Sequence, residues 1–227
     1  MPTGSVLHER ALSIAQEAHH GQSRRHGAPY IGHPLAVRAL VEDLAHATGL
    51  ELDDATRAVA LLHDVIEDSD IGREELAARF GDRVAGDVWL LSKTGKGEAA
   101  AAAYYARLVR EASDAVRLVK VCDRVHNLSE LHLAPSADKL TSYIDETLLH
   151  VVPLARSAQS RGIARGLEAA LHDGIRAACR AQHRAIPEAA AAPSRAVPTG
   201  LYPILMPRPG ELAVAVADLV RRATSLI

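Results

Sequence analysis

The sequence has few aromatic residues and few cysteines, and each shortage excludes a class of protein. Only 3% of the 227 residues are aromatic, whereas 48% are hydrophobic. A core made mainly of Ala, Leu, Val and Ile favours packed helices over aromatic-rich sheets. The two cysteines, Cys122 and Cys179, lie far apart in the chain. Their number and spacing exclude a disulfide scaffold and a zinc knuckle.

The chain also lacks a strong charge of one sign, a long apolar run and a targeting segment. Its formal net charge is −2, which argues against a nucleic-acid partner. No run reaches the roughly 18 apolar residues of a membrane span, and residues 1–10 do not follow the pattern of a signal peptide. These absences predict a soluble cytoplasmic protein with no membrane partner.

What the chain does have is helical periodicity over most of its length. Apolar residues recur at three-to-four spacing, which predicts an all-α bundle. Pro153 should kink or open the helix that contains it. We expect one main domain over residues 1–182, and an Ala/Pro-rich linker with a C-terminal helix (Glu211 to Leu226) over residues 183–227. The expected helices of the main domain span residues 6–18, 35–47, 53–68, 73–80, 82–91, from about 98, 114–131, 136–157 and 163–182.

The stretch LLHDVIED, residues 61–68, places four ionisable residues inside a helix that is expected to be buried. Burying unpaired charges costs several kcal/mol, so these residues need partners. His63 and Asp64 lie about 100° apart on a helix and can reach one point, where an imidazole and a carboxylate suit Mn, Fe or Zn. Glu67 and Asp68 lie one turn further on, in position for a general base or a group that orients water.

Two residues elsewhere are candidates for completing the set of ligands. His33, in PYIGHP, is held by flanking prolines where a loop meets a helix. Asp123, in KVCDRVHNL, is a carboxylate on an otherwise apolar helix, and Lys120 and Asn127 share its face. Together with residues 61–68, they offer His, His-Asp and Asp from three helical elements.

Each of these signals also has a simpler interpretation. A His-Asp pair on a helix is often an exposed or satisfied contact, His33 could cap a helix, and Asp123 with Arg124 could be a surface ion pair of little energetic value. The concentration of acids between apolar residues favours a functional site over these alternatives. We expect several other histidines to be solvated and without a role: His8, His19, His46 and His172.

Five short blocks occur in an order and spacing that resemble a known family. They are GQSR (21–24), PYIGHP (29–34), LLHDVIED (61–68), FGDRV (80–84) and KVCDRVHNL (120–128). Together they resemble the metal-dependent HD hydrolase domain of the RelA/SpoT family. The size of the chain resembles the small alarmone hydrolases of the Mesh1 type. The resemblance covers residues 6 to 158 and implies a helical HD-domain bundle.

The resemblance implies a role for each matching residue. The metal ligands that it implies, usually occupied by Mn²⁺, are His33, His63, Asp64 and Asp123. Glu67 and Asp68 match the acidic pair that positions and activates the attacking water. The substrate-binding residues that it implies are Arg24 on the base, Tyr30 and Asn127 beside the nucleoside, and Lys93 near the phosphates. The implied reaction is hydrolysis of the 3′-diphosphate of guanosine tetra- or pentaphosphate (ppGpp or pppGpp), with release of pyrophosphate.

The chain departs from the family pattern in three places. Leu128, Ser129 and Glu130 follow Asn127 where the family has a Met-Arg-Thr-like run, so Glu130 could repel a second phosphate group of the substrate or point to solvent. No synthetase domain follows in this chain, so synthesis of the alarmone is not expected. The part from about residue 163 has no counterpart, and three roles stay open for it: covering the site, forming a homo-oligomer, or remaining partly disordered.

Two other functions stay open beside alarmone hydrolysis. The same metal centre could serve a phosphatase that acts on the 2′-phosphate of NADPH or on a nucleoside monophosphate, in a specialised biosynthetic pathway. The chain could instead be a non-catalytic sensor of a nucleotide. Glu67 and Asp68 argue against the sensor, because binding alone does not require them.

Overall fold

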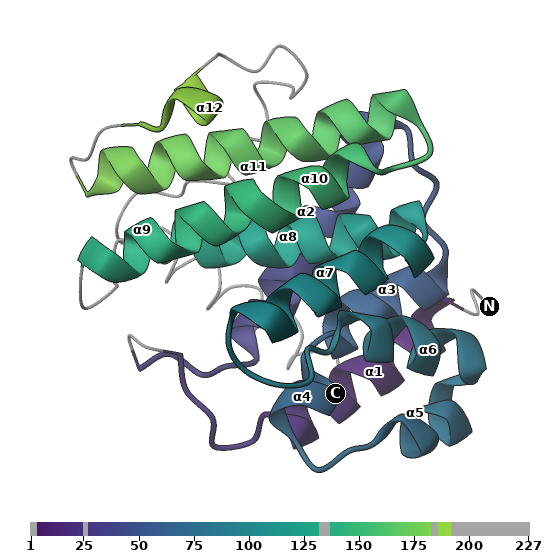
Figure 1. The fold of residues 1–227 in the computed structure, drawn as a ribbon. Coiled ribbons are helices and arrows are strands. Elements are labelled where there is room, and N and C mark those ends of the chain that lie inside the picture. Colours follow the sequence, from purple (N-terminus) through teal and green to yellow (C-terminus); the bar gives the residue numbers. More distant parts are fainter. Residues whose placement is uncertain (1–3, 25–26, 132–136, 183–185, 192–227) are drawn as a thin grey trace.

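The computed structural model describes residues 4–24, 27–131, 137–182 and 186–191 (Figure 1). Every regular element within these ranges is a helix, so the predicted all-α fold is confirmed. No helix among the described residues is both long enough and apolar enough to cross a membrane. The helices are α1 (Gly4–Ala18), α2 (Gly32–Thr48), α3 (Asp54–Leu62), α4 (Val65–Asp68), α5 (Arg73–Phe80), α6 (Asp82–Leu91), α7 (Glu98–Glu111), α8 (Asp114–Ser129), α9 (Ala137–Glu146), η2 (Thr147–Val151), α10 (Val152–Arg156), α11 (Arg161–Ala181) and α12 (Glu188–Ala191).

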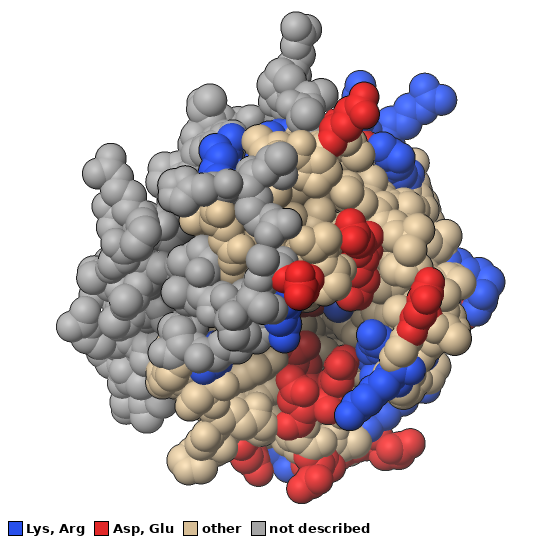
Figure 2. All heavy atoms as spheres, turned by 60° about the vertical axis from the view of Figure 1, so that its left-hand side comes forward, with Lys and Arg blue, Asp and Glu red and all other residues tan. Residues whose placement is uncertain are grey.

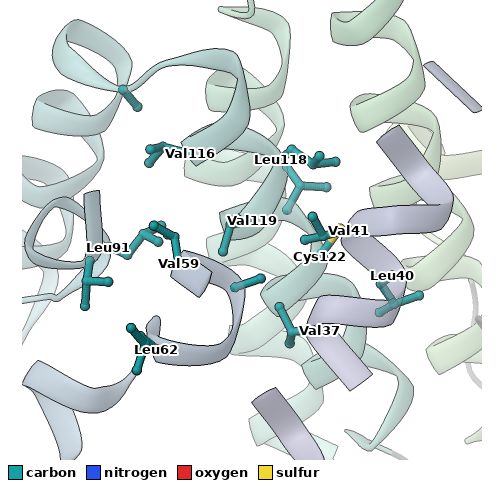
Figure 3. Close-up of a cluster of buried hydrophobic side chains, with 14 of the residues drawn as sticks. Val37, Leu40, Val41, Val59, Leu62, Leu91, Val116, Leu118, Val119 and Cys122 are labelled. Atoms are coloured by element: carbon teal, nitrogen blue, oxygen red, sulfur yellow. The ribbon is translucent and has the colours of Figure 1, made fainter. Parts of the chain in front are cut away.

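The core lies where α2, α3 and α8 meet, and aliphatic side chains fill it (Figure 3). Short and branched side chains of this kind let helices approach closely and fix their relative positions. The same three helices carry or adjoin the predicted metal ligands, so the core also fixes the site. The buried residues drawn at this junction include Val37, Leu40 and Val41 from α2, Val59 and Leu62 from α3, and Leu118, Val119 and Cys122 from α8.

A further layer is formed by α11, which lies against α8 and α2 (Figure 1). Its first half places Leu167 in the main core, and its second half places Ile175 in a smaller buried cluster. The part of the chain from residue 163 to the end of α11 is therefore ordered and belongs to the bundle. The helix expected over 211–226 lies outside the described residues, and the domain boundary at residue 182 stays a prediction.

Pro153 opens the helix that contains it, as the sequence predicted. The turn before it, Thr147–Val151, winds as a π-helix between α9 and α10, and the Val152 N–H donates to the Thr147 carbonyl. A proline has no N–H to donate, and its ring clashes with the carbonyl four residues earlier. The wider turn relieves this crowding while the helix continues in the same direction. Ser136, where this helix was expected to begin, lies outside the described residues.

Asp53 caps α3, the helix that leads to the predicted metal ligands. Its carboxylate accepts hydrogen bonds from the Thr56 N–H at 2.8 Å and the Thr56 hydroxyl at 2.7 Å, and it pairs with Arg83. Burial alone would raise the pKa of Asp53, but the Thr56 bonds and the Arg83 charge lower it to about 2. A carboxylate with a lowered pKa stabilises the fold above its unfolded pKa of about 4. This contribution is lost as the pH falls towards 2.

We expect Asp53→Ala to lower the free energy of unfolding by about 1 kcal/mol at pH 7, because α3 loses its cap. Asp53→Asn keeps a capping oxygen but carries no charge. It should therefore retain most of the wild-type free energy of unfolding at pH 7. Between pH 4 and pH 2 this free energy should fall less than it does in the wild type. Urea unfolding at several pH values measures both effects. Equal acid sensitivity of Asp53→Asn and the wild type would contradict this account.

Gly166 allows α11 to cross close to the end of α2. A Cβ atom at Gly166 would lie 2.2 Å from Thr48 Cγ2, whereas the nearest atom to a Cβ at Gly162 is Ser160 Oγ, at 3.7 Å. We expect Gly166→Ala to cost about 1–2 kcal/mol, because overpacking outweighs the helix propensity that alanine adds. Thermal unfolding measures this cost.

Two variants separate the clash from other effects of the substitution. Gly162→Ala on the same helix should cause no loss of stability, because the added methyl group has room. In a Thr48→Ser background, which lacks Cγ2, the cost of Gly166→Ala should disappear. A cost that persisted in that background would show that the close approach at Thr48 is not its cause.

Candidate metal centre

The chain bends between α3 and α4, and this bend carries two of the predicted ligands. α3 ends at Leu62, His63 and Asp64 form a turn, and α4 begins at Val65. The single helix expected through residues 61–68 is therefore wrong. Asp64 has φ −100° and ψ −5°, which lies in the sparsely allowed bridge region next to helical geometry. In this turn Asp64 Oδ2 lies 3.1 Å from His63 Nε2.

The four predicted ligands converge, although they come from three separate parts of the chain. His33 lies in the first turn of α2 and Asp123 in the middle of α8. His33 Nε2 lies 3.1 Å from His63 Nε2 and 3.3 Å from both Asp64 Oδ2 and Asp123 Oδ1. His63 Nε2 lies 3.8 Å from Asp123 Oδ1. Only the Asp64 side chain, 19% exposed, retains substantial contact with solvent.

These separations fit one divalent ion. Donor atoms that surround an ion with bonds of about 2.0–2.2 Å lie about 2.9–3.6 Å apart, depending on whether the coordination is octahedral or tetrahedral. Four of the donor pairs are 3.1–3.3 Å apart, and His63 and Asp123 are 3.8 Å apart. His33, His63 and Asp64 form the tighter group, with all their donor atoms within 4.8 Å of one another, and Asp123 adjoins it through the two histidines. Two imidazoles and two carboxylates form a mixed nitrogen and oxygen donor set, which suits Mn, Fe or Zn. The residues present are therefore able to hold a metal of this kind.

Neighbouring groups fix which atom of each histidine faces the centre. His63 Nδ1 lies 2.9 Å from the Ala60 carbonyl oxygen, so Nδ1 carries the proton and Nε2 offers its lone pair. His33 Nδ1 lies 2.9 Å from His126 Nδ1. Burial and the neighbouring His33 hold the pKa of His126 well below its usual value. His126 is therefore neutral, and its Nδ1 can accept a hydrogen bond from His33 Nδ1. The sequence analysis missed His126, although it lies three residues after Asp123 and therefore on the same side of α8.

Asp123 is held by Lys120 and Asn127, the two residues that were expected to share its face. Lys120 Nζ donates to Asp123 Oδ2 at 2.9 Å, and Asn127 Nδ2 donates to Oδ1 at 2.6 Å. Burial would raise the pKa of Asp123, but the Lys120 charge and a hydrogen bond from His33 hold it well below its usual range. Asp123 is thus kept ionised, with Oδ1 turned towards the two histidines.

The electrostatic field at the centre favours a cation. Burial would lower the pKa of His63, but the carboxylates of Asp64 and Asp123 raise it to about 9. A raised imidazole pKa means that the surroundings stabilise positive charge at this ring. The same field stabilises a divalent cation, whose binding requires the neutral form of His63.

Glu67 and Asp68 lie on α4, one turn beyond His63 and Asp64. Both are exposed, so the expectation that all four ionisable residues of the 61–68 stretch are buried is wrong for these two. The Lys93 N–H donates to Glu67 Oε2 at 2.9 Å. Desolvation still raises the pKa of Glu67 above its ordinary value, against the opposing effect of this bond. A carboxylate with a raised pKa suits proton transfer near neutral pH. Figure 2 shows acidic side chains gathered beside a hollow of the surface, with basic side chains on its rim.

Tyr30 connects the predicted ligand Asp64 to the acid Asp68. Its hydroxyl lies 2.7 Å from Asp64 Oδ2 and 3.0 Å from Asp68 Oδ2, and it donates its one proton between them. Its ring stacks on His19 at 4.5 Å between centroids. Burial and the Asp64 charge raise the pKa of Tyr30, so the phenol stays protonated as the donor. The geometry gives Tyr30 a role in holding Asp68 that the sequence analysis did not predict.

We expect Tyr30→Phe to lower kcat by roughly 10- to 100-fold, because a hydrogen bond to a charged group contributes about 1.5–3 kcal/mol. KM should change little, since the phenyl ring retains the stacking on His19. Steady-state kinetics and the Mn²⁺ affinity of the variant measure this. A rise in KM alone would instead support the contact with the nucleoside that the family resemblance implies.

His19 corrects another expectation. It was expected to be solvated and idle, but it is buried, with only 3% of its surface exposed. Its Nδ1 lies 3.0 Å from Gln22 Oε1, and its ring supports Tyr30. Of the other three histidines in that group, His46 is exposed as expected, whereas His8 and His172 are half-buried.

Arg24 and Asn127, two of the predicted substrate-binding residues, lie together on one side of the centre. The Arg24 Nη2 donates to Asn127 Oδ1 at 2.7 Å, and its guanidinium lies 5.3 Å from the centre of the Tyr30 ring. Arg24 also forms an ion pair with Glu130. Lys93 reaches the site through its backbone N–H. The contacts of all four predicted substrate-binding residues with a nucleotide stay predictions.

Two histidines and two aspartates that converge inside a helical bundle define a class: all-α proteins with a divalent-metal centre. Within this class, the HD domain family matches residues 11–157. The chain therefore belongs to the HD domain family, as its motifs predicted.

Relatives of this chain include long bacterial proteins. It is 38% identical over 152 residues to the GTP pyrophosphokinase of Streptomyces coelicolor, which covers 65% of this chain and 17% of the relative. It is 36% identical over 157 residues to GTP pyrophosphokinase rsh of Brucella melitensis, covering 66% of this chain and 20% of the relative. The chain thus spans no more than a fifth of the length of these relatives.

A solved structure has the same fold. It is described as "A metazoan ortholog of SpoT hydrolyzes ppGpp and plays a role in starvation responses". The likeness has a TM-score of 0.64 at 23% identity and covers 78% of this chain and 96% of that one. These likenesses confirm the predicted resemblance to RelA/SpoT-type HD domains.

Proposed function

We propose that this chain is a metal-dependent nucleotide phosphohydrolase that removes the 3′-diphosphate of ppGpp or pppGpp. The observation that carries the proposal is the convergence of His33, His63 and Asp64, whose donor atoms all lie within 4.8 Å of one another, with Asp123 Oδ1 3.3 Å from His33. The acids Glu67 and Asp68 lie one turn away. The metazoan protein of the same fold is described as hydrolysing ppGpp, which supports this substrate.

The residues have distinct tasks in this reaction. His33, His63, Asp64 and Asp123 would hold a divalent ion, which when bound would polarise a phosphoryl oxygen and lower the pKa of water. Glu67, with its raised pKa, takes a proton from the attacking water at its carboxylate. Tyr30, Arg24 and Lys93 orient the groups around the reacting phosphate.

The remaining steps follow from charge and geometry. The Tyr30 hydroxyl holds the Asp68 carboxylate so that it orients the same water. The water oxygen forms a bond to the phosphorus next to the ribose O3′, and the P–O3′ bond breaks. Pyrophosphate leaves, and O3′ takes up a proton to become a hydroxyl. Lys93 supplies positive charge for the phosphates, and the planar guanidinium of Arg24 can stack on the base.

Mn²⁺ is the metal that we propose for the centre. The mixed nitrogen and oxygen donors of the site suit Mn²⁺, and they also suit Fe and Zn. We also propose a cytoplasmic location, which agrees with two buried free cysteines, Cys122 and Cys179.

The test is product analysis with Mn²⁺, with ppGpp, NADPH and a set of nucleoside monophosphates as substrates. Efficient release of pyrophosphate from ppGpp is the expected result. Orthophosphate from NADPH or a monophosphate, with ppGpp left intact, would overturn the proposed substrate while keeping the metal centre. The same assay with Mg²⁺, Zn²⁺ and Fe²⁺ tests the metal, and binding without turnover of any substrate would favour a nucleotide sensor.

A second candidate is a phosphatase that acts on a nucleoside monophosphate or on the 2′-phosphate of NADPH. The observation that favours it is the pairing of Arg24 with Glu130, because this carboxylate reduces the attraction of the site for a substrate with many phosphates. The two candidates differ in their product, which is pyrophosphate for the first and orthophosphate for the second.

A further inference from the structure

Glu130 neutralises Arg24, a basic residue of the loop that leads into α2. Arg24 Nε donates to Glu130 Oε2 at 2.9 Å, and Arg24 Nη2 donates to the same oxygen. The two side chains are only 15% and 13% exposed. Burial would lower the pKa of Arg24, but Glu130 raises it, so the guanidinium and the carboxylate are held as a charged pair.

Asn127 connects the Arg24–Glu130 pair to Asp123 of the metal centre. Asn127 donates to Asp123 at 2.6 Å and accepts from Arg24 at 2.7 Å, and Arg24 contacts Glu130. Glu130 follows Asp123 by seven residues, which corresponds to about 10 Å along α8. A nucleoside whose 3′ phosphates are at the metal centre has its base and its 5′ end within this distance.

The charge of Glu130 acts on any anionic group near this end of the site. Without Glu130, Arg24 would attract the phosphates at the 5′ end of a nucleotide. With Glu130 beside it, the pair has no net charge, so an additional phosphate gains no attraction from Arg24 and is repelled by the Glu130 carboxylate. The discrimination should therefore grow with the number of 5′ phosphates.

We propose that Glu130 is a specificity-determining residue that makes the enzyme prefer guanosine 3′-diphosphates with fewer phosphates at the 5′ end. The proposal rests on the proposed function, and it names the members of that substrate class that the site favours. The preference, measured as kcat/KM, is highest for one 5′ phosphate, lower for two and lowest for three. The residue acts through its field on the substrate and takes no part in breaking the P–O3′ bond.

The test uses three substrates that are cut at the same bond: guanosine 3′-diphosphates with one, two and three 5′ phosphates. For the wild type with Mn²⁺, we expect kcat/KM to fall by about fivefold for each added phosphate, which corresponds to about 1 kcal/mol. Glu130→Gln, which keeps the shape and an acceptor for Arg24, should reduce this to less than about twofold. Glu130→Asp keeps the charge and should retain the wild-type order.

A second measurement needs no variant. Raising the salt from about 0.1 M to 1 M shortens the Debye length from about 10 Å to 3 Å, so the wild-type preference should weaken. The inference is overturned by equal dependence on phosphate number in wild type and Glu130→Gln, or by a wild-type preference that salt leaves unchanged. No pyrophosphate from any of the three substrates would instead overturn the proposed function, and the inference with it.

Discussion

Asp64→Ala should abolish both metal binding and turnover, whereas Glu67→Ala should abolish turnover alone. Asp64 Oδ2 lies 3.1 and 3.3 Å from the two histidine nitrogens of the centre, so its loss removes one donor of the closely spaced group. A divalent ion contributes several kcal/mol to the stabilisation of a reacting phosphate, and each 1.36 kcal/mol is a factor of ten in rate. We expect activity to fall on the order of 10³-fold or more, with Mn²⁺ no longer bound at micromolar concentrations.

Glu67 should behave differently because, among the described residues, its carboxylate accepts a hydrogen bond from the Lys93 N–H and not from any of the four predicted ligands. Removing a general base costs about 10²- to 10⁴-fold in rate, and the metal affinity should stay within about threefold of the wild-type value. Isothermal titration with Mn²⁺ and initial rates on ppGpp measure the two properties separately. Asp70→Ala, at an exposed acid on the same segment, is the matched control and should change neither. Turnover retained by both Asp64→Ala and Glu67→Ala would show that the chemistry lies elsewhere.

Much of this arrangement can be predicted from local sequence. The helices over residues 73–80 and 82–91 begin and end where the pattern predicted, because Gly81 adopts a positive φ of 85° between them. A glycine is suited to that conformation, and it is visible in the sequence. The convergence of His33, His63, Asp64 and Asp123 could likewise be predicted from residue type and motif, because a metal site restricts both, and their role as ligands stays a prediction.

The features that sequence analysis missed depend on contacts across the fold. Arg24 and Glu130 are 106 residues apart, so nothing local indicates that they form a pair. His19 is buried only because Tyr30 stacks on it after the loop folds back. The break at His63 and Asp64 has no glycine or proline to mark it. The periodicity there fits one helix, and only convergence with α2 and α8 distinguishes a bend from a continuous helix.

Lys120→Met should destabilise the metal-free protein strongly and the Mn²⁺-bound protein much less. Lys120 Nζ lies 2.9 Å from Asp123 Oδ2, and their side chains are 15% and 8% exposed. Burial would lower the pKa of Lys120, but Asp123 raises it well above its ordinary value, so the lysine is charged in the folded protein. Removing one partner of a buried pair costs about 3–5 kcal/mol, because the other charge remains buried. For a protein of this size we expect Tm to fall by roughly 6–20 °C without metal.

Mn²⁺ should restore most of this loss, because the ion places positive charge against Asp123 where Lys120 supplied it. Lys120 also repels a bound cation, so its removal strengthens metal binding, and both effects enlarge the rise in Tm on adding Mn²⁺. Thermal unfolding with and without saturating Mn²⁺ measures the difference, with Lys96→Met as the control at an exposed lysine. An increase in Tm on metal addition that is no larger in Lys120→Met than in the wild type would mean that Lys120 does not balance the charge of the centre. A larger increase in Tm would show that Lys120 keeps Asp123 ionised and in position in the metal-free protein.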